Sequence, residues 1–345
     1  MKHHVTMQQI ADEAGVSTAT VSRVLTGQGL VGAATRERVQ ALIDKYHYTP
    51  NSVARTLVRK QSNMLGMLVQ DIGNPYFSTL YLEAERYAIE QGYTLLISSS
   101  LTFDSEKIAL QRMREWQVDG VIMISSSIDW TDRNPQVLDC ILAMQKNVPM
   151  VLINEPIDDF DIPFVVANNY QGYRTAMDHL FSLGHRDIAF VGGMNNNTTM
   201  QLRHDAYSDA YRARGLTPDP VMTRMLGYGH EDGKQAMMQI LSSVRVPTAV
   251  LCANDVTAMG VLNVCRTQRL DIPGDVSVVS CDNTFIAEAS SPGLTSIDVA
   301  PGAQGVTAIR ELIDLIRGEE IPQVTYVPSN LVIRGSTGKA VRRDL

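Results

Sequence analysis

One face of a short predicted helix, from Thr18 to Leu25, has the side chains that a DNA-reading helix needs. Three of these side chains are small, those of Thr18, Ala19 and Ser22, and the fourth, Arg23, is a long hydrogen-bond donor. A helix in the major groove presents such residues to the base edges. The Arg23 guanidinium can donate two hydrogen bonds to O6 and N7 of a guanine, which discriminates against another base by about 1–3 kcal/mol. The alternative is an ordinary three-helix bundle with a solvated arginine.

The residues around this face predict the helices that position it. Thr6 and Gln9 have the spacing of a capping box, so a first helix is expected after Thr6. Gly15 permits a sharp turn, and Ser17 can cap the second helix. A third helix is expected from about Ala33 to Tyr46. The side chains positioned to offer a hydroxyl or an amide to DNA phosphates are Thr6, Ser17, Thr20, Ser22 and Asn51.

The charge of the chain is unevenly distributed. The net charge is −7, but residues 1–60 contain eight basic and four acidic residues. A basic N-terminal segment on an acidic remainder is typical of a phosphate-binding module joined to a module that does not bind nucleic acid. Charge alone leaves chance clustering open as the alternative.

From Met64 onward the pattern of the sequence changes. Apolar strand-like runs alternate with helical segments, and the alternation resumes after an apparent break near residues 168–170. This pattern predicts two lobes, each a parallel sheet with helices on both faces. Ligands of such sheets bind at the carboxyl ends of the strands, so a ligand cleft is expected between the lobes. The stretch from Ser52 to Arg59 is interpreted as a linker.

Composition and motifs argue against several other classes of protein. Hydrophobic residues make up 44% and charged residues 19%, which is typical of a globular protein, and no apolar stretch is long enough to cross a bilayer. The segment from Met1 to Ala11 lacks the apolar core of a secretory signal, so a cytoplasmic location is expected. The four cysteines have no metal-ligand spacing, and neither a metal nor a cofactor is expected. The common hydrolase, phosphate-loop and zinc-protease motifs are absent, so no enzymatic activity is expected.

The motifs of the N-terminal segment resemble a known family. Residues 5–17 (VTMQQIADEAGVS), 20–25 (TVSRVL), 35–39 (TRERV) and 48–57 (YTPNSVARTL) closely resemble the headpiece of the lac repressor and galactose repressor family of bacterial transcription regulators. The similarity extends over nearly the whole chain. It implies an all-α helix-turn-helix headpiece on an α/β body of two doubly wound parallel-sheet subdomains, like a periplasmic binding protein.

The resemblance also implies where the parts of the chain begin and end. The headpiece is expected at residues 1–50, a hinge helix and linker at 51–62, and the effector-binding and dimerisation body at 63–338. Within the body, the N-lobe is expected at about 63–166 and 296–324. The C-lobe is expected at about 167–295 and 325–338.

Residue by residue, the resemblance places DNA contacts in the headpiece and the hinge. Thr18, Ala19 and Arg23 match residues with which the family reads the major groove. Leu57 matches a leucine that the family inserts into the minor groove, where an apolar wedge kinks the duplex. The alternative for Leu57 is a linker leucine that packs on the lobes. The other hinge residues expected to contact DNA are Arg55 and Val58.

The same resemblance assigns ligand contacts in the body. Arg203, Asp282 and Asn254 match an arginine, an aspartate and an asparagine of the family's pocket. Together they suit vicinal hydroxyls, because each hydroxyl both donates and accepts. A structural ion pair between Arg203 and Asp282 is the alternative. Tyr76 and Phe77 match ligand contacts whose rings suit the faces of a sugar or a base, and packing in the helix core is their alternative.

Weaker ligand contacts are expected at five further positions: Asn154, Glu155, Asn168, Thr199 and Tyr228. At Glu155 some purine-responsive members have an aromatic residue, so its carboxylate favours a polyol or sugar over a purine. The segment 227–231 looks one residue shorter than the family pattern. Tyr228 is therefore only the best choice for an aromatic wall, and His230 is interpreted as a surface residue.

These interpretations predict a homodimeric repressor of sugar catabolic or transport genes. Its partners would be a pseudo-palindromic double-stranded operator and a small effector, a sugar or sugar derivative, with no membrane partner. The effector would change the arrangement of the lobes and thereby the pairing of the hinge helices. Three alternatives remain: a regulator that responds to a nucleoside or purine, a sugar-binding protein without a regulatory role, and an enzyme on a doubly wound fold.

Overall fold

The computed structural model describes residues 5–27, 29–46, 48, 61–124, 127–157, 160–243 and 246–341. The chain forms two compact units, Met1–Ser62 and Asn63–Leu345. Four of the expected DNA contacts lie outside the described residues: Asn51, Arg55, Leu57 and Val58.

The described part of the first unit, the headpiece, contains α1 (Met7–Ala14), α2 (Thr18–Thr26) and α3 (Ala33–Lys45). The predicted capping box is present, because Gln9 N donates to Thr6 Oγ1 over 3.2 Å and Thr6 N donates to Gln9 Oε1 over 2.8 Å. Gly15 has a φ of 65°, the left-handed conformation that suits glycine, and this allows the turn into α2. Apolar residues at helical spacing fill the small core: Ile10, Ala11, Ala14, Val21, Val24, Val39 and Ile43.

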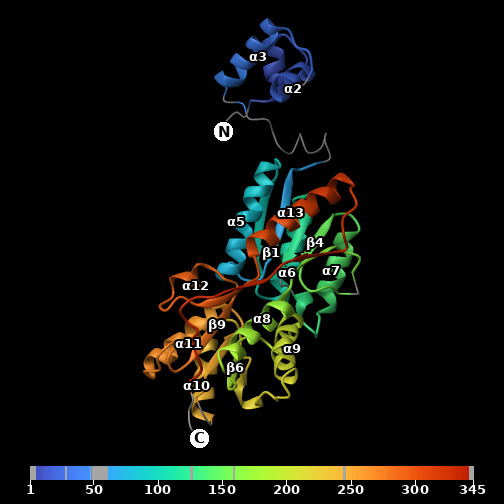
Figure 1. The fold of residues 1–345 in the computed structure, drawn as a ribbon. Coiled ribbons are helices and arrows are strands. Elements are labelled where there is room, and N and C mark those ends of the chain that lie inside the picture. The colour runs from blue at the N-terminus through green and yellow to red at the C-terminus, as the bar shows by residue number, and fades with distance from the viewer. Residues whose placement is uncertain are drawn as a thin grey trace. The chain divides into compact units, whose positions relative to one another are not determined.

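The second unit, the body, contains two six-stranded sheets (Figure 1). The first sheet has the order β11-β5-β4-β3-β1-β2, and its strand pairs are parallel. Buried apolar runs form its four inner strands, which are β1 (Met64–Val69), β3 (Gly120–Ile124), β4 (Met150–Ile153) and β5 (Phe164–Ala167). The two edge strands, β2 (Thr94–Ser99) and β11 (Val324–Val327), are partly exposed.

Helices cover both faces of the first sheet. One face packs against α5 (Pro75–Glu90) and α13 (Pro301–Arg317), which lie side by side in Figure 1. The other face packs against α6 (Phe103–Glu115) and α7 (Pro135–Gln145). We call this sheet and its helices the first lobe.

The second lobe is built on the order β12-β10-β9-β8-β6-β7. Its strands are β6 (Ile188–Val191), β7 (Thr223–Arg224), β8 (Ala249–Cys252), β9 (Ser277–Cys281), β10 (Thr295–Asp298) and β12 (Asn330–Val332). The edge strand β12 runs antiparallel to β10, and the other pairs are parallel. One face carries α8 (Asn169–Ser182) and α9 (Thr198–Arg212), and the other carries α10 (His230–Ser243) and α11 (Asp255–Thr267). A short helix, α12 (Phe285–Ala289), follows β9.

The chain crosses between the lobes a few residues after the approximate positions expected. β10 pairs with β9, so residues 295–298 belong to the second lobe, although the N-lobe was expected to resume at 296. β11 pairs with β5, so residues 324–327 belong to the first lobe, although the C-lobe was expected to resume at 325. In both places the chain leaves the lobe only after the strand has ended, because the backbone groups of the strand are hydrogen-bonded to that sheet.

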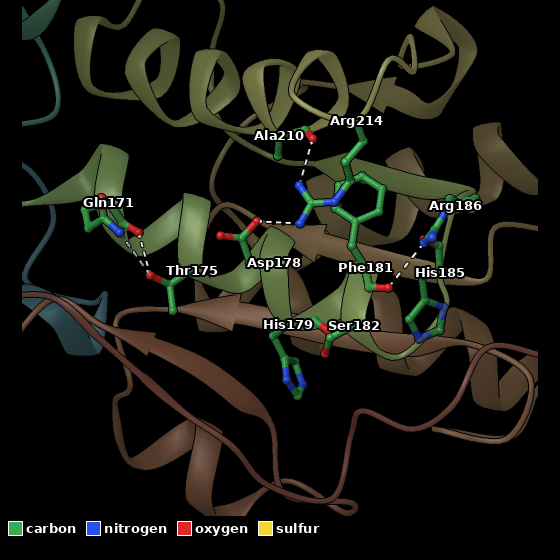
Figure 2. Close-up of polar contacts among 10 residues, drawn as sticks. All are labelled: Gln171, Thr175, Asp178, His179, Phe181, Ser182, His185, Arg186, Ala210 and Arg214. Carbon is green, nitrogen blue, oxygen red and sulfur yellow. Dashed lines mark hydrogen bonds and ion pairs between the residues drawn. The ribbon is translucent and has the colours of Figure 1, made fainter.

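The outer surface of α8 is tied to its neighbours by side chains from distant segments (Figure 2). Arg214, which follows α9, donates to Asp178 over 2.8 Å and lies 4.2 Å from the centroid of the Phe181 ring. His185 Nε2 donates to the Gly338 carbonyl over 3.0 Å, so the turn after α8 holds the C-terminal segment. These contacts account for the segment Gly184–Arg186 as a structural turn.

Candidate functional site

In the headpiece, the predicted DNA-reading face is exposed to different degrees along α2. Ala19 and Arg23 are exposed, while Thr18, Thr20 and Ser22 are half-buried. The hydroxyls of Thr6 and Ser17 are exposed, but each already accepts a helix-capping hydrogen bond. The Thr6 hydroxyl also donates to Gln9 Oε1 over 3.4 Å, and the Ser17 hydroxyl lies 3.0 Å from Thr20 Oγ1, so a phosphate contact would have to compete with these bonds.

A cavity of about 320 Å³ lies between the two lobes of the body. Its lining comes from segments that follow the carboxyl ends of strands in both sheets, which is where doubly wound folds bind ligands. The structure brings all but one of the predicted ligand-contact residues to this cavity: Tyr76, Phe77, Asn154, Glu155, Thr199, Arg203, Tyr228, Asn254 and Asp282.

Asn168 is the exception, and the prediction for it was wrong by one residue. Asn168 is the N-cap of α8, and its exposed side chain accepts from Gln171 N over 3.1 Å. Asn169 lines the cavity instead. Successive residues of a helix point about 100° apart, so a shift of one position exchanges an inward side chain for an outward one.

Arg203 of α9 is buried against the floor of this cavity. Its Nε donates to Asn169 Oδ1 over 3.0 Å, and its NH1 donates to the Ala253 carbonyl over 2.9 Å. The guanidinium also lies 5.3 Å from the centroid of the Tyr173 ring. Among the described contacts Arg203 makes no direct hydrogen bond to Asp282, so the alternative of a structural ion pair has no support here.

Asp282 follows β9 and is 5% exposed. Its φ is 95°, an unusual conformation for a residue with a Cβ atom. Burial raises the pKa of this carboxyl to about 7, although the positive charge of Arg203 acts in the opposite direction. Burial at this site therefore favours the protonated form of the carboxyl more than solvent exposure would.

A second buried aspartate, Asp255, holds the loop that carries Asp282. Its Oδ1 accepts from Ser280 Oγ over 2.6 Å and from Ser296 Oγ over 3.0 Å, and its Oδ2 accepts from Thr284 N over 2.7 Å. The residues on both sides of Asp282 are thus bonded to one carboxylate. We infer that Asp255 positions Asp282 in its strained conformation.

Asn254 and Tyr228 form a connected part of the wall. Asn254 is the N-cap of α11, where its Oδ1 accepts from Thr257 N over 2.7 Å. Its Nδ2 donates to the Tyr228 carbonyl over 3.1 Å, so Asn254 also fixes the segment that carries the Tyr228 ring. His230, the first residue of α10, lies outside the lining, where its Nδ1 is 3.1 Å from Glu231 Oε1.

The two predicted aromatic contacts both line the cavity from the N-terminus of α5. Tyr76 donates its hydroxyl hydrogen to Gln304 Oε1 over 3.1 Å. Phe77 is buried in the core of the first lobe, and its ring lies edge-on to Tyr76 with the centroids 5.0 Å apart. Phe77 thus combines core packing with a place in the lining.

Sequence reasoning missed Asp129, which lies after β3 and joins the two lobes. Its Oδ2 accepts from Asn197 Nδ2 over 2.6 Å, and its Oδ1 accepts from the Thr199 hydroxyl over 3.1 Å and from Thr199 N over 3.3 Å. Burial raises the pKa of Asp129 to about 6, while these hydrogen bonds lower it. Its position beyond a strand end was a usable signal, because the same rule pointed to Asn154 and Glu155.

The contact between the lobes continues along the next residues. Thr131 N donates to the Asn196 carbonyl over 2.8 Å, and Asn196 Nδ2 donates to Asp132 Oδ1 over 3.1 Å. Trp130 and Asn197 form an isolated antiparallel β-bridge. On the side of the cavity lined by Asp129, Asn197 and Thr199, hydrogen bonds therefore join the two lobes directly.

Two absences hold for the residues that the structure describes. No cluster of three or more His, Cys, Asp or Glu side chains is arranged to bind a metal ion. No helix in this part of the chain combines the length and the apolar character that a membrane span requires.

Family comparisons agree with the two-unit organisation. The model described as "Bacterial regulatory proteins, lacI family" matches residues 6–51, and the model of a periplasmic binding protein-like domain matches residues 177–337. The HTH-type transcriptional repressor CytR of Escherichia coli K12 is 31% identical over 335 residues, which cover 96% of each chain. The chain belongs to the lacI family. As a member of this family it is a DNA-binding transcriptional repressor and not an enzyme.

Further relatives of this lacI-family chain cover nearly its whole length. The HTH-type transcriptional repressor PurR of Yersinia enterocolitica is 32% identical over 342 residues, 98% of each chain. Among solved structures, the lac repressor dimer bound to operator and the anti-inducer ONPF is 28% identical, with a TM-score of 0.87 over 97% of this chain and 99% of that one. The predicted fold class, a helix-turn-helix headpiece with a two-subdomain α/β body, is confirmed.

Proposed function

We propose that a small molecule bound between the lobes controls how tightly this repressor holds its operator. The observation that carries the proposal is the cavity, which Arg203 and Asp282, both buried, line together without bonding to each other. A buried charged group needs polar partners. Arg203 has them in Asn169 and the Ala253 carbonyl, so it is mainly Asp282 that calls for a polar ligand. A ligand that prefers one arrangement of the lobes shifts the equilibrium between arrangements and thereby the DNA affinity.

The ligand is proposed to be a sugar or sugar derivative. Arg203, Asp282 and the amides of Asn154 and Asn169 offer the mixture of donors and acceptors that neighbouring hydroxyls need. A cavity of about 320 Å³ lies within the size range of small-ligand sites. In this proposal the chain represses sugar catabolic or transport genes.

A nucleoside or purine is the second candidate ligand. The rings of Tyr76, Phe77 and Tyr228 line the same cavity, and such rings provide stacking faces for a base. The half-buried carboxylate of Glu155 favours the sugar, because it replaces a potential stacking surface with a hydrogen-bond acceptor.

The chain is further proposed to act as a homodimer. The edge strand β2 exposes Ile97, and the neighbouring α5 exposes Leu82 and Ile89 by 57% and 63%. Tyr81 of α5 donates to the Leu95 carbonyl of β2 over 3.4 Å, so the two elements lie side by side. Exposed apolar groups beside an open sheet edge are typical of a surface that a partner covers. The related lac repressor structure is described as a dimer.

The residues proposed to contact DNA lie in the headpiece and in the segment that follows it. Base contacts are proposed for Thr18, Ala19 and Arg23, and phosphate contacts for Thr6, Ser17, Thr20, Ser22 and Asn51. Minor-groove contacts are proposed for Arg55, Leu57 and Val58. Two headpieces of a dimer would read two half-sites of a pseudo-palindrome. A repressor acts where the DNA is, so a cytoplasmic location is part of this proposal.

Operator binding with and without the headpiece tests the proposed function. A duplex selected from a random pool with the full chain is labelled, and its fluorescence anisotropy is followed with the full chain and with residues 63–345. The full chain is expected to bind in a salt-dependent way, because phosphate contacts release counterions. Residues 63–345 are expected to lose DNA binding but to keep the thermal stabilisation that a ligand gives the full chain. Salt-independent binding, or equal binding by residues 63–345, would contradict the proposal.

A further inference from the structure

The charged side chains that line the cavity are mostly acidic. Among the described residues the lining contains four carboxyl groups and one cationic group: Asp71, Asp129, Glu155, Asp282 and Arg203. A charged ligand must give up its hydration shell to enter, and only opposite charges or donors in the wall compensate for that loss. Above about pH 7, where both Asp129 and Asp282 are ionised, the balance of charges in this wall opposes an anion.

The one cation is already engaged by the protein. Two nitrogens of Arg203 donate to the Asn169 side chain and to the Ala253 carbonyl. A phosphate or carboxylate is usually held by two parallel hydrogen bonds from one guanidinium. The internal bonds of Arg203 turn part of that donor fork away from a ligand.

The helix N-termini at the cavity, the other common anion sites of proteins, are occupied by side chains of the chain itself. Asn74 accepts from Tyr76 N over 3.0 Å at the start of α5, and Asn254 accepts from Thr257 N over 2.7 Å at the start of α11. At the start of α9, Asn197 accepts from Met200 N over 2.9 Å. The Asp129 carboxylate, itself an anion, takes the position at Thr199 N. These amides are not free for a phosphate.

The acceptors of the lining, by contrast, have spare capacity. Asp282 is 5% exposed, and the hydrogen-bond partner found for its carboxyl among the described residues is the weakly donating thiol of Cys281. Glu155 accepts from Asn169 Nδ2 through Oε1 only, over 3.0 Å. Each of these carboxyl groups can accept more hydrogen bonds than the protein supplies, so a ligand that brings N–H or O–H groups gains by binding here.

We propose that the effector carries no anionic group and is an uncharged or cationic molecule with several N–H or O–H donors. This inference rests on the proposed ligand-binding role of the cavity. Neutral sugars, amino sugars and nucleosides satisfy it, whereas sugar phosphates, sugar acids and nucleotides do not. Asp282 and Glu155 would accept hydrogen bonds from the ligand, and Arg203 would donate one to a ligand oxygen.

Binding of matched probes to the full chain tests this assignment. The panel consists of hexoses, pentoses, disaccharides and nucleosides, each compared with its phosphorylated counterpart, and for the sugars also with the amino and acid counterparts. Thermal shift selects binders and titration calorimetry gives their Kd. We expect at least one neutral or amine-bearing probe to bind, and its anionic counterpart to bind at least about tenfold more weakly. An anion that binds more tightly than its neutral parent, or a panel without any neutral or amine-bearing binder, overturns the proposal.

Two variants test whether the cavity lining causes the preference for a neutral probe over its phosphorylated counterpart. Glu155→Gln keeps an acceptor for Asn169 and removes one charge, so the preference for the neutral probe over its phosphate should shrink about tenfold. Glu90→Gln, which changes an exposed carboxylate of α5, is the matched control and should leave the ratio unchanged. An unchanged ratio in Glu155→Gln, with the control also unchanged, counts against the proposal.

The outcome is separable from that of the proposed function. If the chain binds a neutral probe but never binds DNA, the proposed regulatory function is contradicted and the assignment of an uncharged or cationic ligand is supported. If the chain releases its operator only with a phosphorylated probe, the proposed regulatory function is supported and the assignment of an uncharged or cationic ligand is contradicted.

Discussion

In the headpiece the side chains proposed to recognise DNA lie on the surface of α2, whereas in the body the side chains proposed to recognise a ligand are enclosed between two lobes. Arg23 is exposed to solvent, while Arg203 is 9% exposed and bonded to Asn169 and Ala253. A surface site can meet a rigid, highly charged duplex without paying for burial in the free protein. A cavity must keep its polar groups satisfied before the ligand arrives. The two sites should therefore be separable by mutation, since one depends on exposed contacts and the other on an internal network.

Truncation of the buried pair should have the largest effect. Asp282→Ala or Arg203→Ala removes one of two buried charged groups and is expected to weaken ligand binding by about 2–5 kcal/mol, with operator binding retained. Calorimetry with the best neutral probe measures ligand binding, and fluorescence anisotropy with the labelled operator measures DNA binding. An unaltered ligand dose response would show that the pocket is misplaced, and loss of both activities would show that the two sites are not separable.

The pH dependence of stability should follow the protonation of Asp282. Burial raises the pKa of this carboxyl from 3.8 to about 7, so the folded chain keeps a proton that the unfolded chain releases. From about pH 4 to about pH 7 the free energy of unfolding should fall as the pH rises, by up to about 1.4 kcal/mol per pH unit from this group, and level off above. Urea denaturation of the parent and of Asp282→Asn checks this. The stability of the variant relative to the parent should increase with pH over that interval, and a constant difference would refute the assignment.

Removal of the proposed base contact should affect the headpiece alone. Arg23→Ala is expected to reduce the preference for the operator over a scrambled duplex by about 1–3 kcal/mol, because the bidentate contact to guanine is lost. Ligand binding by the body should not change. Arg86→Ala removes an exposed arginine of α5 and serves as the control. A retained operator preference in Arg23→Ala would exclude this residue from base readout.

Loss of the contact between the lobes should loosen the body. Asp129→Ala removes the acceptor for Asn197 and Thr199 and is expected to lower the free energy of unfolding by about 1–3 kcal/mol. The separation of the lobes should also increase, which small-angle scattering detects as a larger radius of gyration. Asp139→Ala, at an exposed position of α7, is the control. Equal scattering curves and equal stabilities for both variants would mean that Asp129 does not hold the lobes.

The smallest effect is expected from a helix cap in the headpiece. Ser17→Ala removes the acceptor for Thr20 N and should destabilise α2 by about 1 kcal/mol, whereas Ser17→Asn keeps a capping group. Hydrogen exchange of the α2 amides in the full chain measures this locally, and the body amides should be unaffected. If Ser17→Ala and Ser17→Asn exchange alike, the cap is not what holds the start of α2.

The headpiece could be predicted in detail because its signals are local. The capping box of Thr6, the turn at Gly15 and the cap at Ser17 each involve residues within four positions of one another, and all three are present in the structure. The body was predicted less completely. Strand ends indicated where polar side chains would gather, but the rule did not say which of two neighbouring residues faces inward, and Asn168 was chosen over Asn169.

Local signals in the sequence were enough to predict three short helices, two of them with side-chain caps, followed by apolar strands that alternate with helices. These predictions were possible because capping hydrogen bonds and the periodicity of apolar side chains involve residues only a few positions apart in the sequence. Only the tertiary structure decided that β10 and β11 belong to different sheets, that Asp129 bonds across the lobes to Asn197, and that Arg203 is engaged by Asn169 and Ala253. These choices depend on which distant segments meet, and that is set by the packing of the whole body rather than by any segment alone.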